Sequence, residues 1–127
     1  MAIVPSEFKY SESRAQDIYK HLKNKGFDVY WPAQKLGECS SKYLVIKNDG
    51  SYKHVNYSTD RDMYSIQCYV PKLAYSELEP LVQSVKRAMK ELYPMIIPYG
   101  SQQPSFYDDA IKAHYIVIEY ENHKKIL

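Results

Sequence analysis

The segment that decides the fold is Tyr75–Leu92, YSELEPLVQSVKRAMKEL, which is typical of an amphipathic helix. Its apolar residues recur every three or four positions, as one face of a helix requires. They form one continuous stripe of Leu78, Leu81, Val82, Val85, Met89 and Leu92. Ser76 and Glu79 have the spacing of a capping box at the helix start. Pro94 is incompatible with continuation of the helix, so the segment predicts a helix that ends before it.

Segments rich in β-branched and aromatic residues flank this helix on both sides and predict strands. We expect strands at residues 27–31, 42–47, 51–57, 62–70 and 110–120. Asn48-Asp49-Gly50 is typical of a tight hairpin turn between the second and third of them. A first helix, from about Ser11 to Lys25, precedes the strands. The order is one helix, four strands, a second helix and one or two strands. It predicts an α+β fold, with a mostly antiparallel sheet of about five strands and two helices packed on one face.

Length and composition limit the classes of protein that the chain can represent. The chain has 127 residues, which fit a single domain, 1–127, with one core. Its net charge of +2 is nearly balanced, which argues against a protein whose main task is binding phosphate. No apolar run approaches a membrane span, and the N-terminal residues lack the pattern of a signal peptide. We therefore expect a protein made in a cytoplasm, with Cys39 and Cys68 reduced and used for packing.

The predicted sheet has apolar residues on both of its faces. In the last strand Ile116, Ile118 and Tyr120 share one face, and Tyr115 and Val117 share the other. Two helices can cover only one face of such a sheet. The second face is then covered either by the chain itself, with the first hairpin folded across the last strand, or by a neighbouring subunit.

The segment 96–109, IIPYGSQQPSFYDD, is a long connection for a compact domain, and such connections are usually functional or disordered. It carries the aromatic residues Tyr99, Phe106 and Tyr107, together with Pro98, Gly100 and Pro104. We expect an extended loop. Its aromatic side chains either anchor in a neighbouring subunit or fold back onto the domain.

Sequence motifs of catalysis and cofactor binding are absent. The histidines and cysteines show no metal-ligand spacing, and there is no G-x-S-x-G, P-loop or G-x-G-x-x-G motif. Asp108-Asp109 is interpreted as a solvated pair at the loop exit. The basic residues Lys86, Arg87 and Lys90 are interpreted as a helix C-terminal charge bias. We therefore expect no enzyme activity, no catalytic or metal residues and no cofactor.

Taken in order, the chain resembles the small tail-terminator or tail-completion proteins of long-tailed bacteriophages, prophages and phage-tail-like particles. The resemblance is carried by "NKGFDVYW" after the first helix, "YLVIKNDGSYKHV", "DMYSIQCYVPK" leading into the long helix, and the last strand "AHYIVIEY". It implies a subunit of a hexameric ring that caps the tail tube and joins it to the neck. Implied partners are further copies, the tail tube protein, the sheath protein of a contractile tail and a neck or connector protein. DNA would only pass through the ring lumen, and no membrane is involved.

On this interpretation the protein belongs to the virion, at the tail–neck junction, or to a phage-tail-like particle. One alternative is a head–tail connector adaptor of the same particle, and another, of a different class, is a small nucleic-acid-binding accessory protein. The signature of an RNA-binding sheet module is missing, and its element order differs. The residues that we expect at subunit or partner interfaces are Tyr43, Val45, Lys53, Tyr99, Gln102, Gln103, Phe106, Tyr107, Asp108, Tyr115 and Val117.

Overall fold

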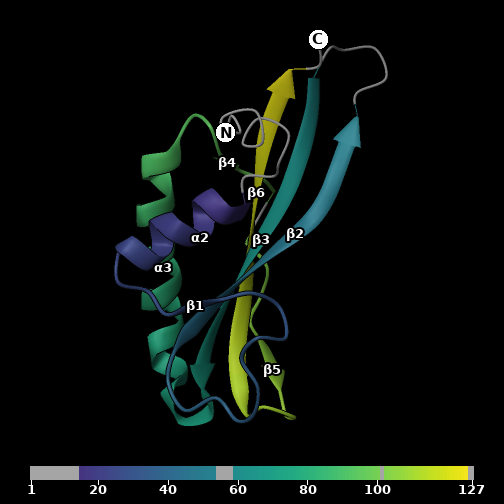
Figure 1. The fold of residues 1–127 in the computed structure, drawn as a ribbon. Helices are drawn as coiled ribbons and strands as arrows, with labels where there is room; N and C mark the ends of the chain where they lie inside the picture. Colours follow the sequence, from purple (N-terminus) through teal and green to yellow (C-terminus); the bar gives the residue numbers. More distant parts are fainter. Residues whose placement is uncertain (1–14, 54–58, 101, 126–127) are drawn as a thin grey trace, which may run out of the picture.

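The computed structural model describes residues 15–53, 59–100 and 102–125, with the side chains of 51–53, 59–60 and 123–125 outside the description (Figure 1). Two helices pack on one face of a six-stranded sheet, which confirms the predicted α+β class. The helices are α2 (Ala15–Asn24) and α3 (Leu78–Met89). The 3₁₀ turns η1 (Lys72–Glu77) and η2 (Lys90–Leu92) extend α3 at its two ends.

The sheet is built around three long strands, and all but one of its pairings are antiparallel. Its strands are β1 (Val29–Tyr30), β2 (Tyr43–Lys53), β3 (Thr59–Pro71), β4 (Ile97–Pro98), β5 (Phe106–Asp108) and β6 (Ala113–Lys125). Their spatial order is β1-β2-β3-β6-β4, and β5 also pairs with β6. Among the strands that the structure describes, only β1 and β2 pair in parallel. The element order roughly fits the predicted one: the predicted strand 27–31 is the short edge strand β1, and the short strands β4 and β5 are added beside β6.

The main core lies between the helices and one face of the sheet. Leu44, Cys68 and Ile116 stand in register across β2, β3 and β6, and Ile46, Ile66 and Ile118 form the next row. These six residues and the predicted α3 stripe are buried, apart from Leu92, which is partly buried. Burial of one such side chain contributes about 1.5–3 kcal/mol. The predicted division of the strands into two faces is therefore correct.

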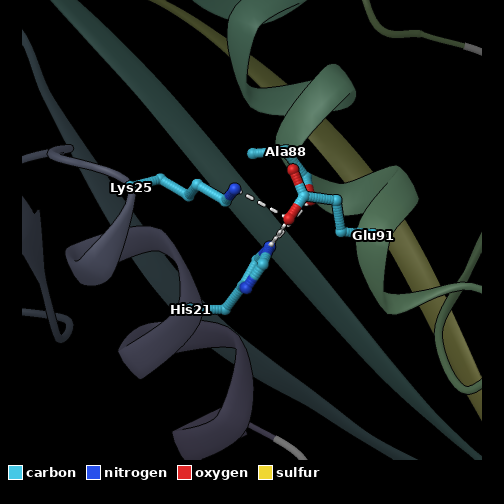
Figure 2. Close-up of polar contacts among 4 residues, drawn as sticks. All are labelled: His21, Lys25, Ala88 and Glu91. Carbon is cyan, nitrogen blue, oxygen red and sulfur yellow. Dashed lines mark hydrogen bonds and ion pairs between the residues drawn. The ribbon is translucent and has the colours of Figure 1, made fainter.

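A group of polar contacts joins the C-terminal ends of the two helices (Figure 2). His21 Nε2 donates a hydrogen bond of 2.8 Å to the Ala88 carbonyl oxygen. Lys25 Nζ lies 2.8 Å from Glu91 Oε1, and His21 Nε2 lies 3.8 Å from the same oxygen. The hydrogen bond from Lys25 holds the pKa of Glu91 below its ordinary value. These contacts join α2 and the residue that follows it to the end of α3 and to η2.

Asn48-Asp49-Gly50 does not form the predicted hairpin turn. The three residues lie inside β2, where Asn48 pairs with Tyr64 and Gly50 with Met63, so Asp49 is one extra residue in the strand. Gly50 adopts a φ of 103°, and its N–H donates to Asn48 Oδ1 at 2.8 Å. This β-bulge uses the chemistry of a turn without reversing the chain. The predicted strands 42–47 and 51–57 therefore belong to one strand as far as Lys53, and the rest of 51–57 lies outside the described residues.

One further prediction about a connection is wrong. Ser76 and Glu79 do not form a capping box, because η1 runs directly into α3 and no side chain caps the helix at Glu77. The segment 96–109, which we expect to be an extended loop, also contains two short strands, since Ile97–Pro98 and Phe106–Asp108 pair with β6 as β4 and β5. Backbone hydrogen bonds to β6 thus anchor the segment at two separate points.

Candidate assembly surface

The structure divides the predicted interface residues into groups by exposure. Tyr99, Gln102, Gln103, Phe106 and Tyr107, all from the segment 96–109, are exposed. Asp108, Tyr115 and Val117 are half-buried. Tyr43 and Val45 are buried within the single chain, so they offer little surface to a partner, and their place at an interface stays a prediction. The side chain of Lys53 lies outside the described residues.

Tyr43 and Val45 are buried because the segment between β1 and β2 crosses the second face of the sheet (Figure 1). Cys39 in this segment packs with Tyr43, Val45 and Ala113. Its N–H donates to the Ile111 carbonyl oxygen at 2.8 Å, which ties the segment to the turn before β6. The chain therefore covers part of its own second face, with this segment and not with the first hairpin.

A row of aromatic rings runs across the second face, perpendicular to the strands. The aromatic row consists of Tyr30, Tyr43, Tyr69, Tyr115 and Phe106, from β1, β2, β3, β6 and β5 in turn. Successive ring centroids are 5.7, 4.9, 5.1 and 5.6 Å apart. The three middle rings have a ring neighbour on each side. Nucleic-acid platforms instead leave ring faces open for bases, so the row is better suited to packing the sheet than to binding bases.

Burial also moves the ionisation of the aromatic row to higher pH. Burial raises the pKa of both Tyr43 and Tyr69 to about 12. Desolvation disfavours the phenolate, and the two hydroxyls stay protonated at neutral pH. The tyrosine hydroxyls at the centre of the second face are therefore uncharged, and the Lys35 ammonium lies 5.5 and 5.9 Å from the ring centres of Tyr30 and Tyr43.

Exposed apolar side chains lie on η1 and on β5: Tyr75 and Tyr107 meet there, and Leu73 precedes Tyr75 by two residues along η1. Leu73 is 96% exposed and Tyr75 is 53% exposed. Tyr75 and Tyr107 both contact the ring of His114, with centroid distances of 4.7 and 4.8 Å. The Tyr75 hydroxyl lies 3.3 Å from Ser105 Oγ, which holds η1 against the segment that leads into β5. We call Leu73, Tyr75 and Tyr107 the apolar knob.

A second apolar feature is a groove between the C-terminal part of α3 and the β4 edge of the sheet. The apolar groove has a volume of about 630 Å³. Its apolar lining consists of Met89, Tyr93, Ile96, Pro98, Tyr99, Ile118 and Tyr120. Lys86, Lys90, Gln102 and Glu119 supply polar groups, and Lys86 Nζ donates a hydrogen bond to Gln102 Oε1. Of the predicted interface residues, only Tyr99 and Gln102 line this groove.

Tyr99 is held at the edge of the groove by its own chain. Its N–H donates to the Glu119 carbonyl oxygen at 2.9 Å. The guanidinium of Arg61 lies 5.5 Å from the centre of its ring, and Arg61 also pairs with Glu121 at 3.4 Å. The cation–π contact orients the ring and leaves 37% of the residue exposed.

The sequence interpretation missed the parts of this surface that lie outside the segment 96–109. Lys86 and Lys90 were assigned to the helix dipole, although their four-residue spacing beside Met89 places all three along one side of the helix. Leu73 and Tyr75 stand between Pro71 and the helix start, outside the apolar stripe. Two apolar residues that precede a helix and lie outside its apolar stripe indicate an exposed apolar cluster, and this was the signal that the sequence offered.

Within the described residues, no group of three or more His, Cys, Asp and Glu side chains could hold a metal ion. No helix in this part of the chain is both long enough and apolar enough to cross a membrane. Cys39 and Cys68 are free and buried, which confirms the prediction that they serve packing.

Fold and surface together define a small α+β domain with an apolar groove and an apolar knob at separate places. A comparison with models of known protein families finds no match to this chain, and a comparison with curated protein sequences finds none either.

Proposed function

We propose that this protein is a structural subunit of a long-tailed bacteriophage or of a phage-tail-like particle, a tail terminator or tail-completion factor. Copies of it form a ring that caps the tail tube, stops its growth and presents a surface to the neck. The order of elements along the chain, on which the resemblance to this family depends, supports the proposal, and so does the distribution of exposed apolar residues.

The observation that carries the proposal is the pair of apolar surfaces at the two ends of α3. The apolar groove and the apolar knob together expose or half-expose several large side chains from η1, β5 and the β4 region. Contiguous apolar surface of this kind marks sites of protein association, where aromatic side chains are enriched. Two different contact surfaces on one subunit suit a ring, in which each copy touches two neighbours through unlike faces.

In the assembled particle, the ring would lie at the junction of tail and neck. One rim would contact the tail tube protein and, in a contractile tail, also the sheath protein. The other rim would contact a neck or connector protein. DNA would pass through the lumen without a dedicated binding site. No catalytic step and no cofactor enter this function.

Negative-stain microscopy and sedimentation velocity of the purified full chain test the proposal. We expect a concentration-dependent assembly that appears as a ring, with six copies as the first expectation. A subunit of 14.9 kDa and its hexamer have very different sedimentation coefficients, so sedimentation velocity checks the number of copies that microscopy shows.

A tail-tube protein that polymerises by itself supplies the functional readout. Addition of the ring should shorten the tubes and leave rings visible at tube ends. A chain that stays monomeric at high concentration, with and without the tube protein, would contradict the proposal.

A further inference from the structure

We propose that the apolar groove of one copy receives the apolar knob of the next copy. This inference rests on the proposed self-assembly and names the two surfaces that make the contact. The groove residues come from α3, η2, β4 and β6, and the knob residues come from η1 and β5.

The two surfaces cannot meet within one molecule. Leu73 and Tyr75 precede α3, whereas Met89, Lys90 and Tyr93 follow or end it. The 12 residues of α3 span about 18 Å, at about 1.5 Å per residue. Figure 1 shows η1 and β5 at one end of the molecule and β4 toward the other end. A knob can therefore enter only the groove of another copy.

The charges beside the two surfaces are complementary. Glu77 and Glu79 are exposed and follow the knob residue Tyr75 by two and four positions, while Lys72 is exposed just before Leu73. Glu77 also borders a pocket that is lined by Lys25 and Lys42. Lys86 and Lys90 stand at the groove together with one carboxylate, Glu119, so basic groups outnumber acidic ones there. One side of the helix carries four polar residues at spacings of four, three and four positions: Glu79, Gln83, Lys86 and Lys90. Docking of a knob in a groove brings acidic residues of one copy toward basic residues of the other, which favours this pairing over groove-to-groove contact.

The groove also matches the knob in size and chemistry. Its volume of about 630 Å³ is large enough for a leucine side chain and an aromatic ring together. Leu73, at 96% exposure, is free to enter it without rearrangement of the core. Aromatic and aliphatic side chains that fill a pocket at the centre of an interface supply most of its binding energy, while the charges at its margin set the orientation.

Site-directed crosslinking tests which surfaces touch. One full-length variant carries Leu73→Cys and a second carries Gln102→Cys, both at exposed positions. The native Cys39 and Cys68 are buried, and burial raises the pKa of both thiols, so a short bismaleimide should select the introduced thiols. Mixing the two variants should give a dimer that is crosslinked between position 73 of one copy and position 102 of the other, which we call the 73–102 product. Neither variant alone should give more than a minor product. The matched control, Lys20→Cys on the exposed side of α2, should not crosslink to position 73.

Charge reversal tests the same contact without crosslinking. Glu79→Lys or Lys90→Glu alone should weaken self-association about threefold to tenfold, and the double variant should recover most of the loss. Lys20→Glu changes the net charge by the same amount as Lys90→Glu and should have no effect. Leu73→Glu, at a site that contributes nothing to the core, should weaken association by at least about tenfold.

The outcomes separate this inference from the proposed function. Rings that form normally with Leu73→Glu, and without a 73–102 product, would overturn the knob-and-groove contact and leave the ring proposal intact. A 73–102 product from an assembly that never exceeds a two-fold dimer would support the contact and contradict the ring. A strict monomer without the product would overturn both.

Discussion

Tyr69 occupies the centre of the aromatic row and shows what a single side chain does for the second face. Its ring lies 4.9 Å from that of Tyr43 and 5.1 Å from that of Tyr115. Its hydroxyl donates to Gln67 Oε1 at 3.1 Å. The ring thus joins three strands side to side, whereas the hydroxyl contacts only a residue of its own strand.

Replacement of Tyr69 by alanine should destabilise the fold by about 2–4 kcal/mol, because two ring contacts and the buried area are lost together. Tyr69→Phe keeps the ring and loses one partly buried hydrogen bond, so it should cost less than about 1 kcal/mol. Urea unfolding followed by circular dichroism measures both. Equal losses for the two variants would show that the hydroxyl, and not the stack, matters.

At this scale the sequence predicted which side of a strand a residue faces but not how deeply it lies. Alternation placed Tyr43, Val45 and Tyr115 on the second face, where they are found. It could not reveal that residues 31–42 cross that face, because a connecting segment without periodicity carries no signal of its path. Burial of Tyr43 therefore became visible only in three dimensions.

Among the elements, β2 shows how a turn motif is reused inside a strand. Asn-Asp-Gly favours a tight reversal when the flanking strands can pair with each other. Here both halves of β2 pair with the longer β3 instead, so the motif forms a bulge. The pairing of β2 with β3 outweighs the preference of Asn-Asp-Gly for a tight turn. This pairing with a distant strand cannot be predicted from the three residues alone.

Gly50→Ala should destabilise the protein by about 1–2 kcal/mol, since a φ of 103° is unfavourable for a residue with a Cβ atom. No atom lies within 4 Å of the added Cβ, so the cost is conformational and not steric. Asp49→Ala, in the same bulge, should change stability by less than about 0.5 kcal/mol. Thermal unfolding of the two variants checks the difference, and an equally stable Gly50→Ala protein would contradict the account.

The length of an element decided how well it could be predicted. The α3 stripe and the apolar pattern of β6 repeat often enough to identify a helix and a strand. By contrast, β4 and β5 have two and three residues. They exist because β6 offers an unpaired edge, a condition that their own residues do not encode.

At the scale of the whole molecule, the candidate site shows the same limit. Aromatic residues in the segment 96–109 pointed to exposed contacts, and Tyr99, Phe106 and Tyr107 are indeed exposed. The apolar groove, however, combines residues from α3, η2, β4 and β6. Such a convergence depends on packing between distant segments, so residue patterns alone could not predict it.

Buried tyrosines make the stability of the whole fold sensitive to alkali. Burial raises the pKa of Tyr43, Tyr69 and Tyr120 to about 12, from an ordinary value of 10. The folded state therefore holds these protons more tightly than the unfolded chain. The stabilisation is complete below about pH 10 and is lost as the pH rises toward 12.

Urea midpoints measured from pH 8 to 12 should fall above pH 10, together with the appearance of phenolate absorbance. Tyr120→Phe removes one of the three groups and should make the fall shallower. A midpoint that stays constant between pH 10 and 12 would contradict the assignment of these tyrosines as buried.

The aromatic row also has a consequence for how the newly made chain folds. Its rings come from β1 near the start of the described chain and from β5 and β6 near its end, so no local segment can assemble it. Closing such distant segments costs chain entropy before any contact forms, and chains rich in distant pairings fold slowly. We expect the row to complete late, after the β2–β3 hairpin. Until then both margins of the sheet stay open, and the nascent protein is most prone to aggregation in that interval.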